Sequence, residues 1–222
     1  MTETAKEKLK LARAAIGKND FQSAKVFYEK VHRELPEDLE AEWFYLFGVL
    51  VVDLIDGNTA SNYTRLVKIF YPTLEYIATF DEGEEKHNLV LAMITGYPPL
   101  KGLVYNTMLQ LLVKDRSAIS TEDAAEVSLA PDVDKKRLAD KILEIFGDSE
   151  PYCFMAVNIW KALIAERYQW SKYRNFQDKG KELWFDELAK RIKKYDPTYE
   201  MPQFKQVGCI STGDAAMVPP GK

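Results

Sequence analysis

Apolar residues recur every three or four positions along most of the chain, which is the spacing of one face of an α-helix. Leu9, Ala12 and Ile16 form the first such series, and Trp184, Leu188 and Ile192 form the last. No stretch alternates convincingly between apolar and polar residues, as a half-buried strand would. The pattern therefore predicts an all-α fold built of stacked antiparallel helical hairpins.

Capping residues, glycines and prolines divide this pattern into separate helices. Thr4 and Glu7 have the spacing of a capping box, and Gly17 can take the left-handed conformation that ends a helix. Gly96 to Pro99 predicts a hard corner between two helices, because proline cannot donate an amide hydrogen. The predicted helices cover about residues 4–16, 20–35, 38–55, 84–95, 100–113 and 179–195. Three more are expected: one that follows the turn at Gly57 and Asn58 and ends by Phe80, one that ends at Gly147, and a long one that starts at Pro151.

The composition along the chain predicts four parts. A helical repeat region covers residues 1–114, and a polar connector with a short helix at 121–129 covers 115–134. A helical C-terminal part at 135–197 would cap the stack. Residues 198–222 are rich in Gly and Pro and predict a tail that is disordered or docked. Tyr199, Phe204 and Ile210 are the residues of that tail that could dock.

Residues near the N-terminus repeat at a fixed interval. Ala24 and Ala60 are 36 positions apart, as are Pro36 and Pro72. The turn Gly-Lys-Asn-Asp-Phe at 17–21 separates the small residue Ala12 from a second helix that carries Ala24 and Tyr28 and ends before Pro36. Over about residues 5–74 the chain resembles the tetratricopeptide repeat, although Thr64 stands where the second unit of that family has an aromatic residue.

This resemblance implies a scaffold that binds another protein or peptide in a groove formed by the first helix of each repeat. The Lys and Asn pattern with which some members bind the C-terminal carboxylate of a chaperone is absent. A partner peptide would fill apolar pockets, with basic side chains supplying directional charge. The positions that match the groove are Lys6, Leu9, Arg13, Ile16, Glu42, Tyr45, Val49 and Val52.

The overall composition fits a cytoplasmic protein. The 222 residues carry a net charge of −4, so no global basic field attracts nucleic acid or an anionic membrane. The charged start of the chain lacks the apolar core of a signal peptide, and its longest apolar run, from Trp43 to Val52, is too short to span a bilayer. The only two cysteines, Cys153 and Cys209, predict no disulfide framework.

No enzyme motif, metal-ligand spacing or cofactor fingerprint occurs in the sequence, which predicts a protein without catalytic activity, metal or cofactor. His32 and His87 lie among charged residues and are predicted on solvated faces. Cys153 is predicted to be a small buried apolar residue. The acidic stretch at 81–85 is expected to cap a helix, because carboxylates favour a helix N-terminus.

A second hypothesis concerns residues 160–195, where aromatic and basic residues interleave. Ten Lys and Arg stand there against five Asp and Glu. Such a patch could bind nucleic acid, or the acidic half of another copy in a homo-oligomer. The alternative is that its aromatic residues are core and its lysines are solvated. The basic residues that would carry this patch are Arg167, Lys172, Arg174, Lys190 and Arg191.

Overall fold

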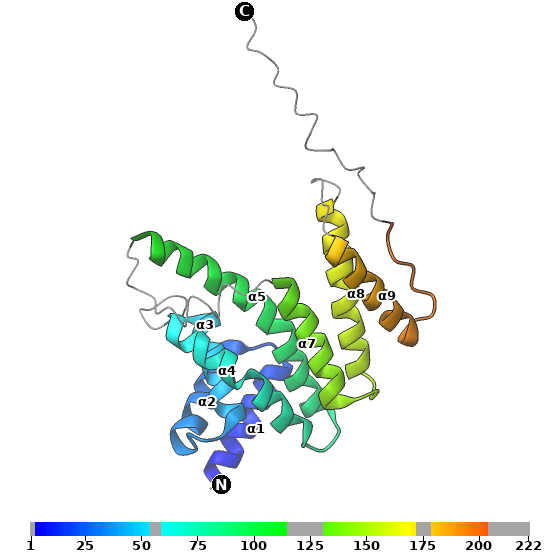
Figure 1. The fold of residues 1–222 in the computed structure, drawn as a ribbon. Helices are drawn as coiled ribbons and strands as arrows, with labels where there is room; N and C mark the ends of the chain where they lie inside the picture. The colour runs from blue at the N-terminus through cyan, green and yellow to red at the C-terminus, as the bar shows by residue number, and fades with distance from the viewer. Residues whose placement is uncertain (1–2, 54–58, 115–130, 172–178, 204–222) are drawn as a thin grey trace, which may run out of the picture. The chain divides into compact units, whose positions relative to one another are not determined.

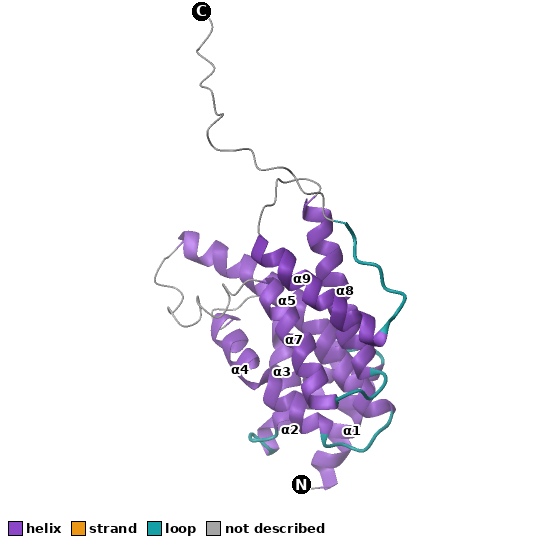
Figure 2. Ribbon diagram, turned by 45° about the vertical axis from the view of Figure 1, so that its right-hand side comes forward, coloured by secondary structure: helices purple, strands orange, loops and turns teal. Residues whose placement is uncertain are grey.

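The structure, a computed structural model, describes residues 3–53, 59–114, 131–171 and 179–203. Within these ranges the chain forms eight helices and no strand, which confirms the all-α prediction (Figures 1 and 2). None of these helices has the length and apolar composition needed to cross a membrane. The helices are α1 (Glu3–Gly17), α2 (Phe21–Glu34), α3 (Leu39–Val52), α4 (Thr59–Ala78), α5 (Glu84–Lys114), α7 (Pro131–Phe146), α8 (Tyr152–Ser171) and α9 (Lys179–Tyr195).

The chain divides into two compact units, Met1–Cys153 (unit 1) and Phe154–Lys222 (unit 2). Helix α7 was predicted in the C-terminal part, but it packs on α4 and α5 within unit 1, where Arg137 lies over the ring of Tyr71 at 5.2 Å. Residues 131–134, predicted as connector, form its first turn, because the fixed φ of Pro131 suits that position. Residues 115–130 lie outside the described part of the chain.

In unit 1 each helix from α1 to α5 packs against the next, as the prediction of helical hairpins required. Helix α5 also packs against α1, so the five helices close into a ring instead of ending in an open layer. Aromatic side chains fill the interior. Trp43 stacks on Phe47 at 5.1 Å and contacts Phe70, which stacks on Tyr97 at 4.5 Å. Three helices, α3, α4 and α5, thus share one aromatic core.

Aspartate side chains cap two of the helices, whereas the predictions for the two ends of the first helix need correction. Asp20 accepts a hydrogen bond from the Ser23 amide at 3.0 Å and begins α2, and Asp38 begins α3 by accepting from the Ala41 amide at 2.9 Å. Asn19, not Gly17, takes the left-handed conformation in the first turn, with a φ of 56°. Thr4 lies inside α1, which begins at Glu3, so the predicted capping box is wrong.

The predicted corner at residues 96–99 is also wrong, since α5 continues through Pro98 and Pro99 as one helix of 31 residues (Figure 1). Tertiary contacts outweigh the amide hydrogen bonds that the two prolines remove. Tyr97 is buried against Phe70, and Gly96 lies so close to the ring of Phe47 that an added Cβ would stand 2.6 Å from it. The aromatic packing beside the prolines therefore stabilises a helix that proline alone would be expected to interrupt.

We expect the substitution Gly96→Ala to lower the free energy of unfolding by about 1–3 kcal/mol, because overpacking a rigid aromatic contact forces the helices apart. Gly102, on the same helix with no atom within 4 Å of its Cβ position, provides the matched control. Gly102→Ala should be neutral or slightly stabilising. Urea unfolding of both variants measures the difference. Equal stability of the two would show that Phe47 moves aside without cost.

Candidate interaction surface

Four of the predicted groove residues share one face of α3. Tyr45, Val49 and Val52 are half-buried at helical spacing, and Glu42 continues the same face toward the start of the helix. The opposite face of α3 carries Trp43 and Phe47 into the core. Tyr45, Val49 and Val52, which we call the α3 stripe, therefore form a partly exposed apolar line on a helix held between α2 and α4.

A histidine from α2 extends this stripe. The ring of His32 stacks on Tyr45, with centroids 5.6 Å apart and an angle of 22° between the planes. Its ring is half-buried, and its Nδ1 is buried with no hydrogen-bond partner among the described residues, so the prediction that His32 lies on a solvated face is wrong. The stacking places the polar edge of the His32 ring beside the aromatic ring of Tyr45 at one end of the stripe.

Two ion pairs between helices flank the stripe. Arg65 of α4 pairs with Glu42 of α3, and Lys25 of α2 pairs with Asp53, the residue after α3, at 2.6 Å. In the first pair the arginine side chain is 58% exposed and the glutamate 10%, whereas in the second pair the aspartate is 48% exposed and the lysine 15%. The stripe therefore has a positive outer group at one end and a negative one at the other.

The α1 half of the predicted groove lies differently. Leu9 and Ile16 are buried in unit 1, with exposures of 7% and 3%. Lys6 is exposed near the N-terminus, and Arg13 is engaged within the unit. Because α1 packs against both α2 and α5, its apolar face is covered by the chain itself. The structure thus leaves Tyr45, Val49 and Val52 of the predicted set partly exposed, buries Glu42 and encloses most of the α1 half.

Arg13 takes part in a buried polar network that the sequence did not reveal. Its Nε and Nη2 donate to both carboxylate oxygens of Glu40 at 3.0 and 2.8 Å, and the hydroxyl of Tyr28 donates to the same carboxylate at 2.8 Å. Glu40 is fully buried. On its other edge Arg13 donates to Glu85 of α5 at 3.3 Å and lies over the ring of Phe80 at 4.8 Å. The Glu40 carboxylate thus joins α1, α2 and α3, and Arg13 links them to α5 through Glu85.

Burial controls the electrostatics of this network. Desolvation raises the pKa of Glu40 above its ordinary value of 4.5, and the hydrogen bonds from Arg13 and Tyr28 oppose that rise. Burial and the nearby carboxylate raise the pKa of Tyr28 well above 10. Although burial lowers the pKa of Arg13, its bonds to Glu40 raise that pKa overall. Glu40 is enclosed, and its three hydrogen bonds join residues of different helices, so we assign this network a structural role.

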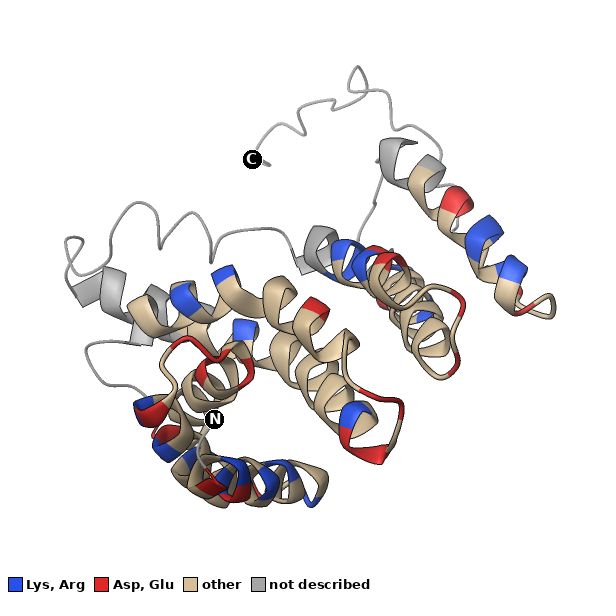
Figure 3. Ribbon diagram, turned by 90° about the horizontal axis from the view of Figure 1, so that it is seen from below, with Lys and Arg blue, Asp and Glu red and all other residues tan. Residues whose placement is uncertain are grey.

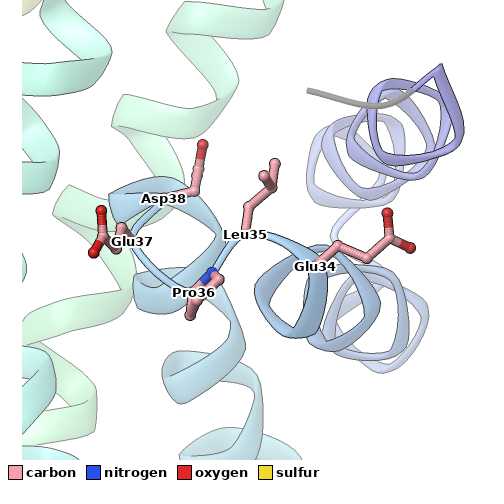
Figure 4. A pocket seen from close by; sticks show the side chains of 5 residues that line it. All are labelled: Glu34, Leu35, Pro36, Glu37 and Asp38. Carbon is pink, nitrogen blue, oxygen red and sulfur yellow. The ribbon is translucent and has the colours of Figure 1, made fainter.

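A hollow of about 410 Å³ lies at the turn between α2 and α3, lined by Glu34, Leu35, Pro36, Glu37 and Asp38. Figure 4 shows Leu35 and Asp38 pointing to the same side of this turn. Asp38 is already the N-cap of α3, and Glu34 pairs with Lys8 of α1. The hollow is open to solvent, and two of its three carboxylates already have partners within the chain. We therefore interpret it as part of the turn between α2 and α3 and not as a ligand site.

The acidic stretch at 81–85 begins α5, with Glu84 and Glu85 in the first turn, where they favour the positive end of the helix. Acidic residues mark the loops at this end of unit 1 (Figure 3). Next to them, the 4% exposed Lys86 donates to the carbonyls of Ala78 and Phe80 at the end of α4, at 2.8 and 3.1 Å, and to Glu82. This role of Lys86 was not predictable from the sequence, because it depends on where α4 ends.

The remaining candidates for chemistry are dispersed. His87 is half-buried, not solvated as predicted, with its ring 6.3 Å from that of Tyr152. Cys153 is buried, as predicted, and Cys209 lies outside the described residues. Within the described ranges no three His, Cys, Asp or Glu side chains gather closely enough to hold a metal ion.

Only part of the basic patch at 160–195 falls within the described residues of unit 2. The guanidinium of Arg191 lies 4.3 Å from the centre of the ring of Trp160, a fully buried core residue. Arg167 is half-buried and Lys190 is exposed. Lys172 and Arg174 lie outside the described part, as do Phe204 and Ile210 of the tail. Nucleic-acid binding by this patch stays a prediction.

Asp196 connects the end of α9 to α8. It accepts from Lys161 at 2.7 Å and from the Thr198 amide and hydroxyl, and these bonds lower its pKa to about 2. The unfolded chain, with an ordinary value of 3.8, binds this proton first as the pH falls. The stability that this carboxylate provides is therefore present above pH 4 and is lost between pH 4 and 2.

We expect Asp196→Asn to lower stability at pH 7 and to reduce the loss of stability between pH 4 and 2. Urea unfolding of both proteins at pH 7, 4 and 2.5 measures the effect. A mutant that loses as much stability on acidification as the wild type would show that the ion pair contributes nothing.

Comparison of this chain with protein-family models, with curated proteins and with solved structures finds no match.

Proposed function

We propose that this chain is a non-enzymatic protein-interaction module that binds a partner protein through the α3 stripe. The observation that carries the proposal is the accessibility of Tyr45, Val49 and Val52 at one-face spacing on a helix whose other side is anchored in the core. The resemblance to tetratricopeptide repeats supports it, because these positions were selected from that match. A cytoplasmic location is part of the proposal.

The chemistry of the stripe suits a binding surface. Tyrosine offers a large, rigid contact area with a polar tip and is enriched among the residues that dominate binding energy. The stacking on His32 restricts Tyr45 further, so less side-chain entropy is lost on binding. The valines have restricted χ1 rotamers. The α3 stripe is therefore preorganised for binding.

The proposal is tested by affinity capture with the wild-type chain and with Tyr45→Glu and Val49→Lys. Both substitutions place a charge in the proposed contact, and each should abolish recovery of a stoichiometric partner. The matched control is Val26→Glu, which changes an apolar residue on α2 that is 36% exposed. Circular dichroism confirms that each variant is folded. Undiminished recovery by both stripe variants would exclude this surface.

A further inference from the structure

The charges at the ends of the α3 stripe limit what can lie on it. Arg65, 58% exposed, stands beside Glu42 near the start of α3, and Asp53, 48% exposed, follows its last residue. Their partners are largely covered, so the outer pole of each pair is accessible to another molecule. Eleven residues separate Glu42 from Asp53 along the chain. At 1.5 Å per residue the backbone of Asp53 lies about 16 Å along α3 from that of Glu42, the partner of Arg65.

Between these poles the accessible apolar residues follow one line. Tyr45, Val49 and Val52 are spaced four and three residues apart, which is the spacing that one helix presents to another. An apolar line of about two turns accepts a partner helix with its own apolar residues at the same spacing. The two charged poles then face the two ends of that partner helix.

We infer that the occupant of the α3 stripe is an amphipathic helix of a partner protein. It carries a basic residue at the end that meets Asp53 and an acidic residue, about three turns away, at the end that meets Arg65. This inference rests on the proposed function, because it describes what binds at the same surface. Charge complementarity at both ends determines how the helix is placed, since like charges would face each other if it were reversed.

Three synthetic helices test this inference. Each contains Leu at positions spaced four and three residues apart and is held helical by a side-chain cross-link, because short free helices are marginal in water. One has a basic and an acidic end, one has two acidic ends and one has two basic ends. Binding to the full chain is measured by the shifts of the amide signals of Tyr45, Val49 and Val52. The mixed helix should bind about three- to tenfold more tightly than either other helix at low salt.

Variants of one residue show whether the charges act as described. Asp53→Lys makes both poles basic, so it should transfer the preference to the helix with two acidic ends. Asp53→Asn should reduce the preference for the mixed helix without creating another one. The preference should also decrease as salt is raised, because exposed charges are screened.

The outcomes separate this inference from the proposed function. If the three helices bind equally, the assignment of charges is wrong and the stripe stays a binding surface. If none shifts the three amide signals while Tyr45→Glu still abolishes partner capture, the occupant is not a helix. If capture is unaffected by Tyr45→Glu, the proposed function fails, whatever the helices do.

Discussion

Replacing Arg13 by Met is expected to lower the free energy of unfolding of unit 1 by about 3–5 kcal/mol, because it leaves the carboxylate of Glu40 buried without its cation. Glu40 has no exposed surface, and two of its three hydrogen bonds come from Arg13. Met retains most of the apolar length of the arginine, so the loss reflects charge and hydrogen bonding more than packing. Urea unfolding at pH 7 measures it.

A second substitution distinguishes a missing cation from a general defect. In the variant Arg13→Met with Glu40→Leu the buried charge is removed as well, and most of the lost stability should return. The hydroxyl of Tyr28 then loses its acceptor, so adding Tyr28→Phe should recover about 1 kcal/mol more. Additive losses in the double variant would contradict the ion-pair explanation, since residues in contact are expected to couple.

Lys8 supplies the control for this series. Lys8 lies on α1, as Arg13 does, and it pairs with Glu34 of α2. Both side chains of that pair are partly exposed. Lys8→Met should therefore change stability by less than about 1 kcal/mol. The difference between Arg13→Met and Lys8→Met isolates the effect of burial on an ion pair between helices.

The sequence was sufficient to predict those features that depend only on residues close together along the chain. Asp20 and Asp38 cap helices that begin where the prediction placed them, and Gly147 ends α7 with a φ of 63°. Each of these features needs only a side chain or a backbone conformation within three or four residues. The apolar periodicity likewise determined the fold class.

Features that depend on distant residues were not predictable in the same way. Gly96 and Tyr97 help α5 to continue through two prolines, but they do so through Phe47 and Phe70, which lie far away in the sequence. Glu40 looks like an ordinary first-turn carboxylate until α1 brings Arg13 to it. The closure of α5 onto α1 is also a tertiary property, and it explains why Leu9 and Ile16 are enclosed while the α3 stripe is accessible.

Lys86 is the other position where one polar side chain is expected to matter strongly. Substituting it by Met should lower the free energy of unfolding by about 2–4 kcal/mol, because the carbonyls of Ala78 and Phe80 lose a charged donor at a covered site. The last carbonyls of a helix have no partner within the helix, so they depend on such a donor. Urea unfolding and amide hydrogen exchange near the end of α4 measure the effect.

Glu82 separates the two roles of this lysine. The glutamate is 70% exposed and pairs with Lys86 at 2.6 Å, so Glu82→Gln removes the ion pair while the two carbonyl bonds remain. We expect that variant to change stability by less than about 0.5 kcal/mol. If Glu82→Gln were as damaging as Lys86→Met, the ion pair would be the important contact. If both were neutral, water would replace the lysine at the carbonyls, and the end of α4 would not need it.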